Sequence, residues 1–323
     1  MTPQARVRGI VSLVALAAAV GVVGFAAWSG GEPPSLASAL KPRAGAPPLA
    51  LDLGVRVDPE AVDLRRALSL YGQGHRTQAA GVFSAYTSLE AQVGQAVAAW
   101  PKGSLARLTT LAASHPRSGL VQVNIGLARF WAGRPGSVEA WRQAAAVEPD
   151  SSYAITADNL LYPRFNRNLP TFVPAEAVPT ELDGKSPPQQ LAILRRNAST
   201  GSVKAKLLYG VALQRLFRPV SARREFDRAA RLAPNDPEAL TAAAVARFDK
   251  AHLSASFSRL GPLTRRFPHA ATVRFHLGLL LLWTGSIKAA EKQLRLATMV
   301  EPGSPLAREA ALFLNTLKGV PTS

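Results

Sequence analysis

Few residues of this sequence have the types and spacing that metal binding or catalysis requires. The chain has five histidines and no cysteine, which excludes disulfides, thiolate metal sites and a cysteine nucleophile. His252, His269 and His276 lie in one region, but no two histidines are four residues apart, the spacing that places two metal ligands on one helix face. We interpret them as surface or packing residues, and a shared site among these three stays open.

The sequence motifs of common enzyme classes are incomplete or absent. Gly72–Thr77 reads GQGHRT, a GxGxxG pattern in which Thr replaces the third Gly. Neither a P-loop nor the Gly-x-Ser-x-Gly turn of hydrolases occurs. We therefore predict a protein that is not an enzyme and that holds no cofactor and no metal ion.

The charge of the chain limits its partners. The formal net charge is +17, and Arg supplies most of the basic residues. A basic chain is attracted to anionic lipid, wall polymer or nucleic acid, whereas scattered Arg is also what a GC-rich genome produces. No aromatic residues that could stack on bases interleave the Arg residues, so nucleic acid is not expected.

The N-terminal region predicts a membrane anchor. Residues 9–28 form 20 uncharged, mostly apolar residues, enough for one helix across a bilayer. Arg6 and Arg8 precede them, so residues 1–8 are expected in the cytoplasm and the rest outside it, on a single-pass protein of the cell membrane. Cleavage as a signal peptide, which would release a secreted protein, is the alternative. Residues 29–58 are rich in Gly, Pro and Ala and are expected to be a flexible linker.

The elements that follow are indicated by a repeat. Pro234, Pro268 and Pro302 are 34 residues apart, and each follows an amphipathic stretch and begins a break. A glycine precedes the second half of two copies, Gly210 in one and Gly278 in the other. The second half then carries a small, a large and a small apolar residue on one helix face. These residues are Ala222, Phe226 and Ala229, and Ala290, Leu294 and Ala297.

This pattern resembles the tetratricopeptide repeat (TPR): its 34-residue period, its Leu-Gly signature, its Ala-x3-Phe-x2-Ala second helix and its terminal Pro. The resemblance implies an all-α protein, a solenoid of antiparallel helical hairpins over residues 59–317. Residues 203–302 hold the best-defined repeats, with Ser256 and Leu260 in a degenerate middle copy. Residues 305–317 are expected to form a terminal capping helix.

An irregular insertion interrupts the array at about residues 163–187. It is rich in Pro and aromatic residues, and we expect helices on either side of it, at 152–162 and 189–197, to form one split hairpin. Loops of this length in compact domains are mostly functional or disordered. Phe165, Phe172 and Val173 indicate that it packs on its own solenoid or on a partner.

The resemblance implies that the first helices line a groove that binds proteins. Lys and Asn are largely missing from that face, so an apolar or amphipathic segment is the expected ligand rather than a C-terminal carboxylate. Coverage by the insertion, or packing between repeats, is the alternative for these residues. The groove candidates are Val123, Leu127, Phe130, Trp131, Leu207, Val211, Gln214, Arg215, Thr241, Val245, Phe248, Phe275, Leu279, Leu282 and Trp283.

These expectations lead to a membrane-anchored scaffold for protein–protein interaction, of the kind that assembles cell-envelope complexes. Two alternatives belong to other classes. One is binding to an anionic membrane or wall surface through an outer face that holds Arg223, Arg224, Arg228 and Arg231. The other is an enzyme subunit that uses the Pro-rich insertion as a lid. It requires acid, base and His side chains beneath residues 163–187.

Overall fold

The structure is a computed structural model and describes residues 41–175, 179–199 and 201–317. These ranges contain fifteen α-helices, one 3-10 turn and no strand, so the expected all-α fold is confirmed for them. None of the helices in these ranges is long and apolar enough to cross a membrane. The predicted membrane helix at residues 9–28 lies outside the described residues.

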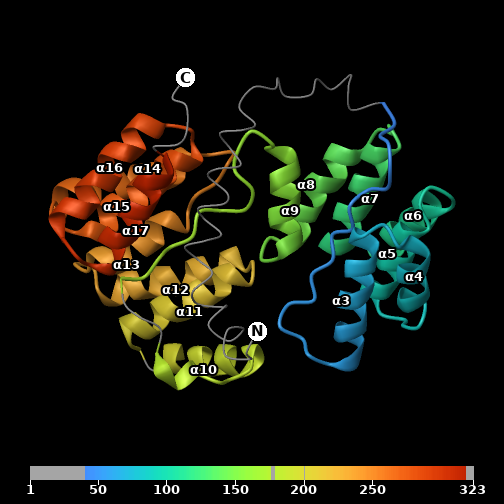
Figure 1. Cartoon of the computed structure of the whole chain (residues 1–323), viewed down its shortest axis with the longest axis horizontal. Coiled ribbons are helices and arrows are strands. Elements are labelled where there is room, and N and C mark those ends of the chain that lie inside the picture. Colours follow the sequence, from blue (N-terminus) through green and yellow to red (C-terminus); the bar gives the residue numbers. More distant parts are fainter. Residues whose placement is uncertain (1–40, 176–178, 200, 318–323) are drawn as a thin grey trace. The chain divides into compact units, whose positions relative to one another are not determined.

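The chain divides into two compact units, which are described separately: an N-terminal unit that ends at Pro163 and a C-terminal unit that begins at Arg164. The N-terminal unit consists of an extended segment and three hairpins followed by a single helix (Figure 1). Its helices are α3 (Pro59–Gly72), α4 (Arg76–Phe83), α5 (Leu89–Ala98), α6 (Ser104–Ser114), α7 (Gly119–Trp131), α8 (Ser137–Val147) and α9 (Ser152–Leu161).

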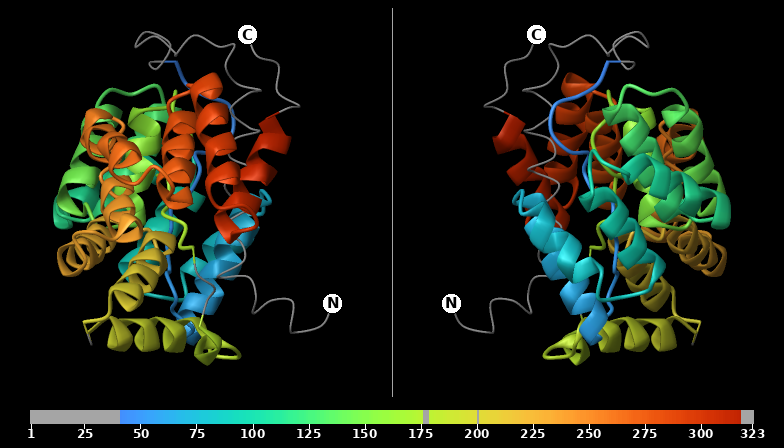
Figure 2. Two further views of the ribbon diagram at one scale, coloured as in Figure 1. Left: turned by 90° about the vertical axis from the view of Figure 1, so that its left-hand side faces the viewer. Right: turned by 90° about the vertical axis from the view of Figure 1, so that its right-hand side faces the viewer.

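The C-terminal unit begins with an irregular segment that contains the 3-10 turn Thr180–Leu182. A single helix, three hairpins and a last helix follow, and the antiparallel stacking of the orange and red helices can be followed in Figure 2. These helices are α10 (Pro187–Ser199), α11 (Val203–Arg215), α12 (Pro219–Leu232), α13 (Pro237–Val245), α14 (Ser254–Arg266), α15 (Ala271–Trp283), α16 (Ile287–Val300) and α17 (Pro305–Leu317).

The 34-residue spacing is a property of this structure as well as of the sequence. The first helices of the C-terminal unit begin at Val203, Pro237, Ala271 and Pro305, so each start follows the previous one by 34 residues. Successive first helices pack on one another, α11 on α13, α13 on α15 and α15 on α17. We call the side of a unit that its first helices form the first-helix face.

Side-chain caps mark where the first helices α3, α7 and α11 begin. Ser118 and Ser202 accept hydrogen bonds from the backbone N–H three residues on, and Asp58 does the same for α3. Such a cap satisfies one of the free N–H groups of the first turn and contributes about 1 kcal/mol. The second helices α4, α8 and α12 have no such bond and instead follow a tight turn directly.

Three hairpins, α7–α8, α11–α12 and α15–α16, close through a glycine on the first helix. A Cβ at Gly210 would lie 2.4 Å from the ring of Phe226, which is fully buried, so only Gly allows α11 and α12 to approach this closely. In the N-terminal unit, a Cβ at Gly126 would lie 2.4 Å from Nε1 of Trp141. The small residues Ala222 and Ala229 on either side of Phe226 are fully buried. The predicted small–large–small stripe therefore forms the contact between the two helices.

The helices that flank the insertion belong to different units. α9 packs on α7 and α8 in the N-terminal unit, whereas α10 packs on α11 in the C-terminal unit. The expected split hairpin of residues 152–162 and 189–197 is therefore divided between the two units. In the middle copy, Ser256 and Leu260 are fully buried on α14, as a degenerate stripe requires.

The glycine contacts predict the effect of a single methyl group. Gly126→Ala should destabilise the N-terminal unit by about 1–3 kcal/mol, because the Cβ overlaps Trp141 and lies 3.1 Å from the backbone oxygen of Ser137. Gly81→Ala is the matched control, since Gly81 is exposed in α4 with nothing within 4 Å of its Cβ position. The control should be neutral or gain about 0.5–1 kcal/mol from helix propensity. Urea unfolding of both variants measures the difference, and equal stabilities would contradict the packing described.

Candidate functional site

Most of the predicted groove residues lie in the interior rather than on an open face. Phe130, Trp131 and Arg215 are half-buried, and burial lowers the pKa of Arg215 to about 10. The others are buried within or between repeats, which was the alternative kept open for them. These buried residues are Val123, Leu127, Leu207, Val211, Thr241, Val245, Phe248, Phe275, Leu279, Leu282 and Trp283. Gln214, like Arg215, is half-buried.

An extended segment of the insertion covers the first-helix face of the C-terminal unit. We call residues 169–175 the C-terminal covering segment; it can be followed in Figure 1 as the lime trace that runs beside α12 and α13. Its backbone N–H groups donate to side chains of three first helices. Phe172 donates to Oε1 of Gln214 (3.0 Å), Val173 to Nε2 of His276 (2.9 Å) and Ala175 to Oε1 of Glu238 (2.7 Å).

One side chain of this segment enters the core. Phe172 is fully buried, and its ring stacks on the imidazole of His276 with centroids 4.8 Å apart and planes 19° apart. It meets Phe226 edge-on, with centroids 5.6 Å apart. Phe226 is the large residue of the α12 stripe, so the covering segment extends the packing that closes the hairpin. The insertion therefore packs on its own solenoid through Phe172.

The hydrogen bonds of His276 fix its protonation state. The N–H of Val173 can only donate, so Nε2 of His276 is unprotonated and accepts. The other nitrogen, Nδ1, then carries the proton and donates to the backbone oxygen of Thr272 at 2.7 Å. Burial lowers the pKa of His276 to about 4, which keeps the ring neutral at physiological pH. Burial has the opposite effect on Glu238 and raises the pKa of its carboxyl.

Acid should therefore loosen the C-terminal covering segment. Between pH 6.5 and 4 the folded chain binds fewer protons at His276 than the unfolded chain, so the stability from the neutral ring is lost as the pH falls. From pH 7 to pH 5 we expect the free energy of unfolding to fall by on the order of 2 kcal/mol, and urea unfolding at the two pH values would measure this loss.

His276→Gln is the control for this titration. Glu238 acts in the opposite direction, because a carboxyl whose pKa is raised by folding adds stability as the pH falls. The His276→Gln variant keeps Glu238 and offers a side-chain oxygen that can accept the N–H of Val173, but it has no ring that titrates. The original chain should lose more stability than the variant between pH 7 and pH 5. An equal loss would show that His276 is not the group that responds.

The N-terminal unit has a covering segment of its own. Residues 43–53, which we call the N-terminal covering segment, belong to the region expected as a linker and lie against the helices (Figure 1). The backbone oxygen of Gly45 accepts a hydrogen bond from Nε1 of Trp100 at 3.0 Å, and that of Pro47 accepts from the hydroxyl of Tyr71 at 2.5 Å. Arg43 lies over the ring of Phe130, 4.0 Å from its centroid.

Two side chains hold the centre of this segment by its backbone. Asn124, only 1% exposed, accepts from the N–H of Ala50 (3.0 Å) and donates to its C=O (2.8 Å), so it pairs with the peptide as a neighbouring strand would. The hydroxyl of Tyr153 lies 3.3 Å from both the N and the O of Asp52. Burial raises the pKa of Tyr153, which keeps its hydroxyl protonated and able to donate.

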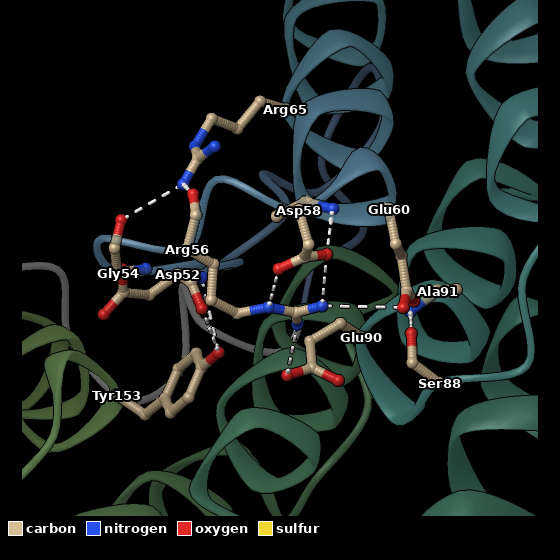
Figure 3. Close-up of polar contacts among 11 residues, drawn as sticks. Asp52, Gly54, Arg56, Asp58, Glu60, Arg65, Ser88, Glu90, Ala91 and Tyr153 are labelled. Atoms are coloured by element: carbon tan, nitrogen blue, oxygen red, sulfur yellow. Dashed lines mark hydrogen bonds and ion pairs between the residues drawn. The ribbon is translucent and has the colours of Figure 1, made fainter. Parts of the chain in front are cut away.

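An ion-pair cluster fixes the chain where this segment turns into α3. Figure 3 shows Arg56 directed at Asp58, with two N–O distances of 2.9 Å, and at Glu60 and Glu90. The guanidinium of Arg56 lowers the pKa of Asp58 to about 2, with help from the N–H of Ala61 that Asp58 caps. The capping carboxylate thus stays charged at all physiological pH values.

The two units place their backbone-binding groups at the same helix positions. Asn124 and His276 are each the sixth residue of a first helix, two residues before the glycines Gly126 and Gly278. Tyr153 is the second residue of α9, and Glu238 is the second residue of α13. Residues two and six lie about 40° apart around a helix at 100° per residue, so they point to the same side. Capture of an extended backbone is therefore a shared property of the two first-helix faces.

Asn124→Ala should release the N-terminal covering segment. The substitution removes both bonds to Ala50, at a cost of about 1–3 kcal/mol. Limited trypsin digestion should then cut faster after Arg43. Gln143→Ala, which removes an exposed side chain bonded to Pro116, is the control and should digest like the unchanged chain. Identical digestion of both variants would contradict the role of Asn124.

Gln214 was predicted on this face from the sequence, whereas the other binding groups were not. His276 was interpreted as a surface or packing residue, and Asn124, Tyr153 and Glu238 were not singled out. The available signal was a polar residue capable of accepting a hydrogen bond at the second or sixth position of a first helix. That signal needs the helix bounds and the knowledge that an extended segment lies opposite.

Comparison with known proteins found similarity to solved structures alone. No protein-family model matches the sequence, and no curated protein matches it. The solved structures found include YrrB, described as a TPR protein with an unusual peptide-binding site (15% identity, 64% of this chain, 97% of that chain, TM-score 0.32). Yeast Tom70 shares 13% identity over 94% of this chain and 58% of its own, with a TM-score of 0.38.

A chain of the APC/C hetero-tetramer Cut9–Hcn1 shares 12% identity over 80% of this chain and 55% of its own, with a TM-score of 0.27. This chain thus spans little more than half the length of the Tom70 and Cut9–Hcn1 chains. Identities and TM-scores this low transfer no residue roles, so the fold type rests on the 34-residue helix spacing and the glycine contacts. The fold is of the tetratricopeptide-repeat type.

Proposed function

We propose that this protein is a membrane-anchored scaffold that binds other proteins, and that it serves in the assembly of a cell-envelope complex. The observation that carries the binding role is the capture of extended backbone by side chains at the same first-helix positions in both units. The anchor is the apolar stretch at residues 9–28, which the sequence supports by length and by its flanking Arg residues.

The chemistry of the face favours an extended ligand. A helical ligand uses its backbone groups internally, so it has no use for side chains such as Asn124 and His276 that donate to or accept from a peptide group. An extended ligand needs them, since its N–H and C=O groups otherwise lose their water without replacement. The apolar character expected of the ligand is supported by the aromatic surroundings of Phe172.

The enzyme alternative receives weaker support. Glu238 and His276 do lie beneath the insertion, which are the residue types that a lid-covered active site requires. Each of them, however, accepts a backbone N–H of the covering segment. Within the described ranges no group of three or more His, Asp or Glu residues is arranged to hold a metal ion. We therefore favour binding over catalysis.

Binding to an anionic surface stays a second candidate. Arg223, Arg224, Arg228 and Arg231 are all exposed on α12, as the outer-face expectation requires, although Arg228 pairs with Glu225. Attraction of this kind is screened by salt. The candidate requires vesicles of anionic lipid to bind the chain at low salt and release it at high salt. Binding that does not change with salt concentration would exclude attraction to an anionic surface.

Site-specific photo-crosslinking tests the scaffold role. A crosslinking amino acid replaces Phe130 or Arg215, which are half-buried on first helices, and in matched controls it replaces Arg142 or Arg224, exposed on second helices. We expect reproducible crosslinks to the same partner proteins from the first-helix positions and few from the controls. Crosslinks from the second-helix positions alone would place binding on the outer face and contradict the proposal. Membrane pelleting of the chain with and without residues 1–28 tests the anchor in the same cells.

A further inference from the structure

We propose that the first-helix face of the C-terminal unit is a binding site for an extended peptide of the type aromatic–any–proline–any, presented by a partner protein. Residues Phe172–Ala175 occupy this site as an intramolecular competitor. The inference rests on the proposed scaffold role and deepens it, because it names the chemistry of one ligand and the way in which access to the site is controlled.

The backbone pattern of the covering segment defines which ligand positions are recognised. The donors are the N–H groups of Phe172, Val173 and Ala175, and the acceptors come from three hairpins. Position 174 is Pro, which has no N–H to donate. A ligand therefore needs free N–H groups at its first, second and fourth positions and tolerates proline at the third.

The side-chain pocket defines the first position. Phe172 is fully buried between the edge of Phe226 and the face of His276, whereas Val173, Pro174 and Ala175 are only half-buried. Aromatic pairs in such geometry add stabilisation beyond the area they bury. Specificity for an aromatic first residue thus comes from one pocket, whereas the hydrogen bonds of the face are made to backbone N–H groups and do not depend on the side chain.

The α11–α12 hairpin has a closing contact of its own besides the covering segment. Gly210 admits the ring of Phe226 directly, and Phe172 adds an edge-on contact to that same ring. The segment lies in the long connection between α9 and α10, with exposed residues on both sides of it at Arg167 and Thr180. It can leave the face without breaking a helix.

The tether determines how strongly a partner must bind. A segment joined to its site through a short flexible connection competes at an effective concentration of about millimolar. An outside peptide should therefore bind the unchanged chain weakly and the chain with a released segment at least about tenfold more tightly. The N-terminal unit captures its own segment at equivalent helix positions, which supports backbone capture as the general chemistry of these faces.

The test uses a fluorescent peptide with the sequence LPTFVPA, that of residues 169–175, and the full chain. Phe172→Ala empties the pocket and should raise affinity for the peptide at least about tenfold over the unchanged chain. Phe165→Ala is the matched control, since that half-buried aromatic ring of the same insertion stacks against its neighbour Arg164 and should leave binding unchanged. A peptide with Ala in place of Phe should not bind. N-methylation at the Val position removes one hydrogen bond and should weaken binding roughly tenfold.

A second variant covers the case in which Phe172→Ala fails to fold, as judged by circular dichroism. Residues 169–175 are replaced by Gly and Ser, which removes the competitor and leaves every helix intact. A folded, released chain that does not bind the peptide at millimolar concentration would overturn the inference, as would equal binding of the Phe and Ala peptides. If partner proteins still crosslink at Phe130 of the N-terminal unit, only this inference fails. If those crosslinks are absent as well, the proposed scaffold role also fails.

Discussion

A backbone that lies extended against helices has no neighbouring strand to satisfy its hydrogen-bonding groups, and this constraint organises both units of the protein. Side chains of first helices take the place of that strand. Asn124 matches both groups of Ala50, and His276 accepts the N–H of Val173. Because unpaired backbone groups away from water are costly, these polar side chains are kept in buried positions that an apolar core would otherwise fill.

On α7 and α15, the hairpin glycine and the binding residue two positions before it follow from the same helix geometry. Two residues correspond to 200° of rotation, so Gly126 and Asn124 point to nearly opposite sides of α7. The glycine admits Trp141 of the second helix, while Asn124 faces the covering segment. Gly278 and His276 repeat this division on α15, where Leu294 takes the place of the tryptophan. One helix thus closes its hairpin on one side and binds an extended chain on the other.

The sequence predicted the hairpins well because their signals are local and periodic. Proline spacing, helix caps and the Ala222–Phe226–Ala229 stripe all act within one repeat, and the helices of residues 203–317 appear where that period requires them. The binding side was harder to predict. Phe275, Leu282 and Trp283 have the right helical direction for a groove, but they are buried by neighbouring elements that no periodicity reveals. Hydrogen bonds such as that between Val173 and His276 join residues 103 positions apart, so they depend on tertiary structure alone.

Hydrogen exchange of the backbone amides tests the central claim most directly. Side chains of first helices hold the extended segments by their N–H groups, so the amides of Ala50 and Val173 should exchange far more slowly than those of an unstructured chain. Measurement residue by residue at neutral pH in the full chain reports on both units at once. Slow exchange at both positions is the result that the account predicts. Exchange of Ala50 and Val173 at the rate of an unstructured chain would contradict it.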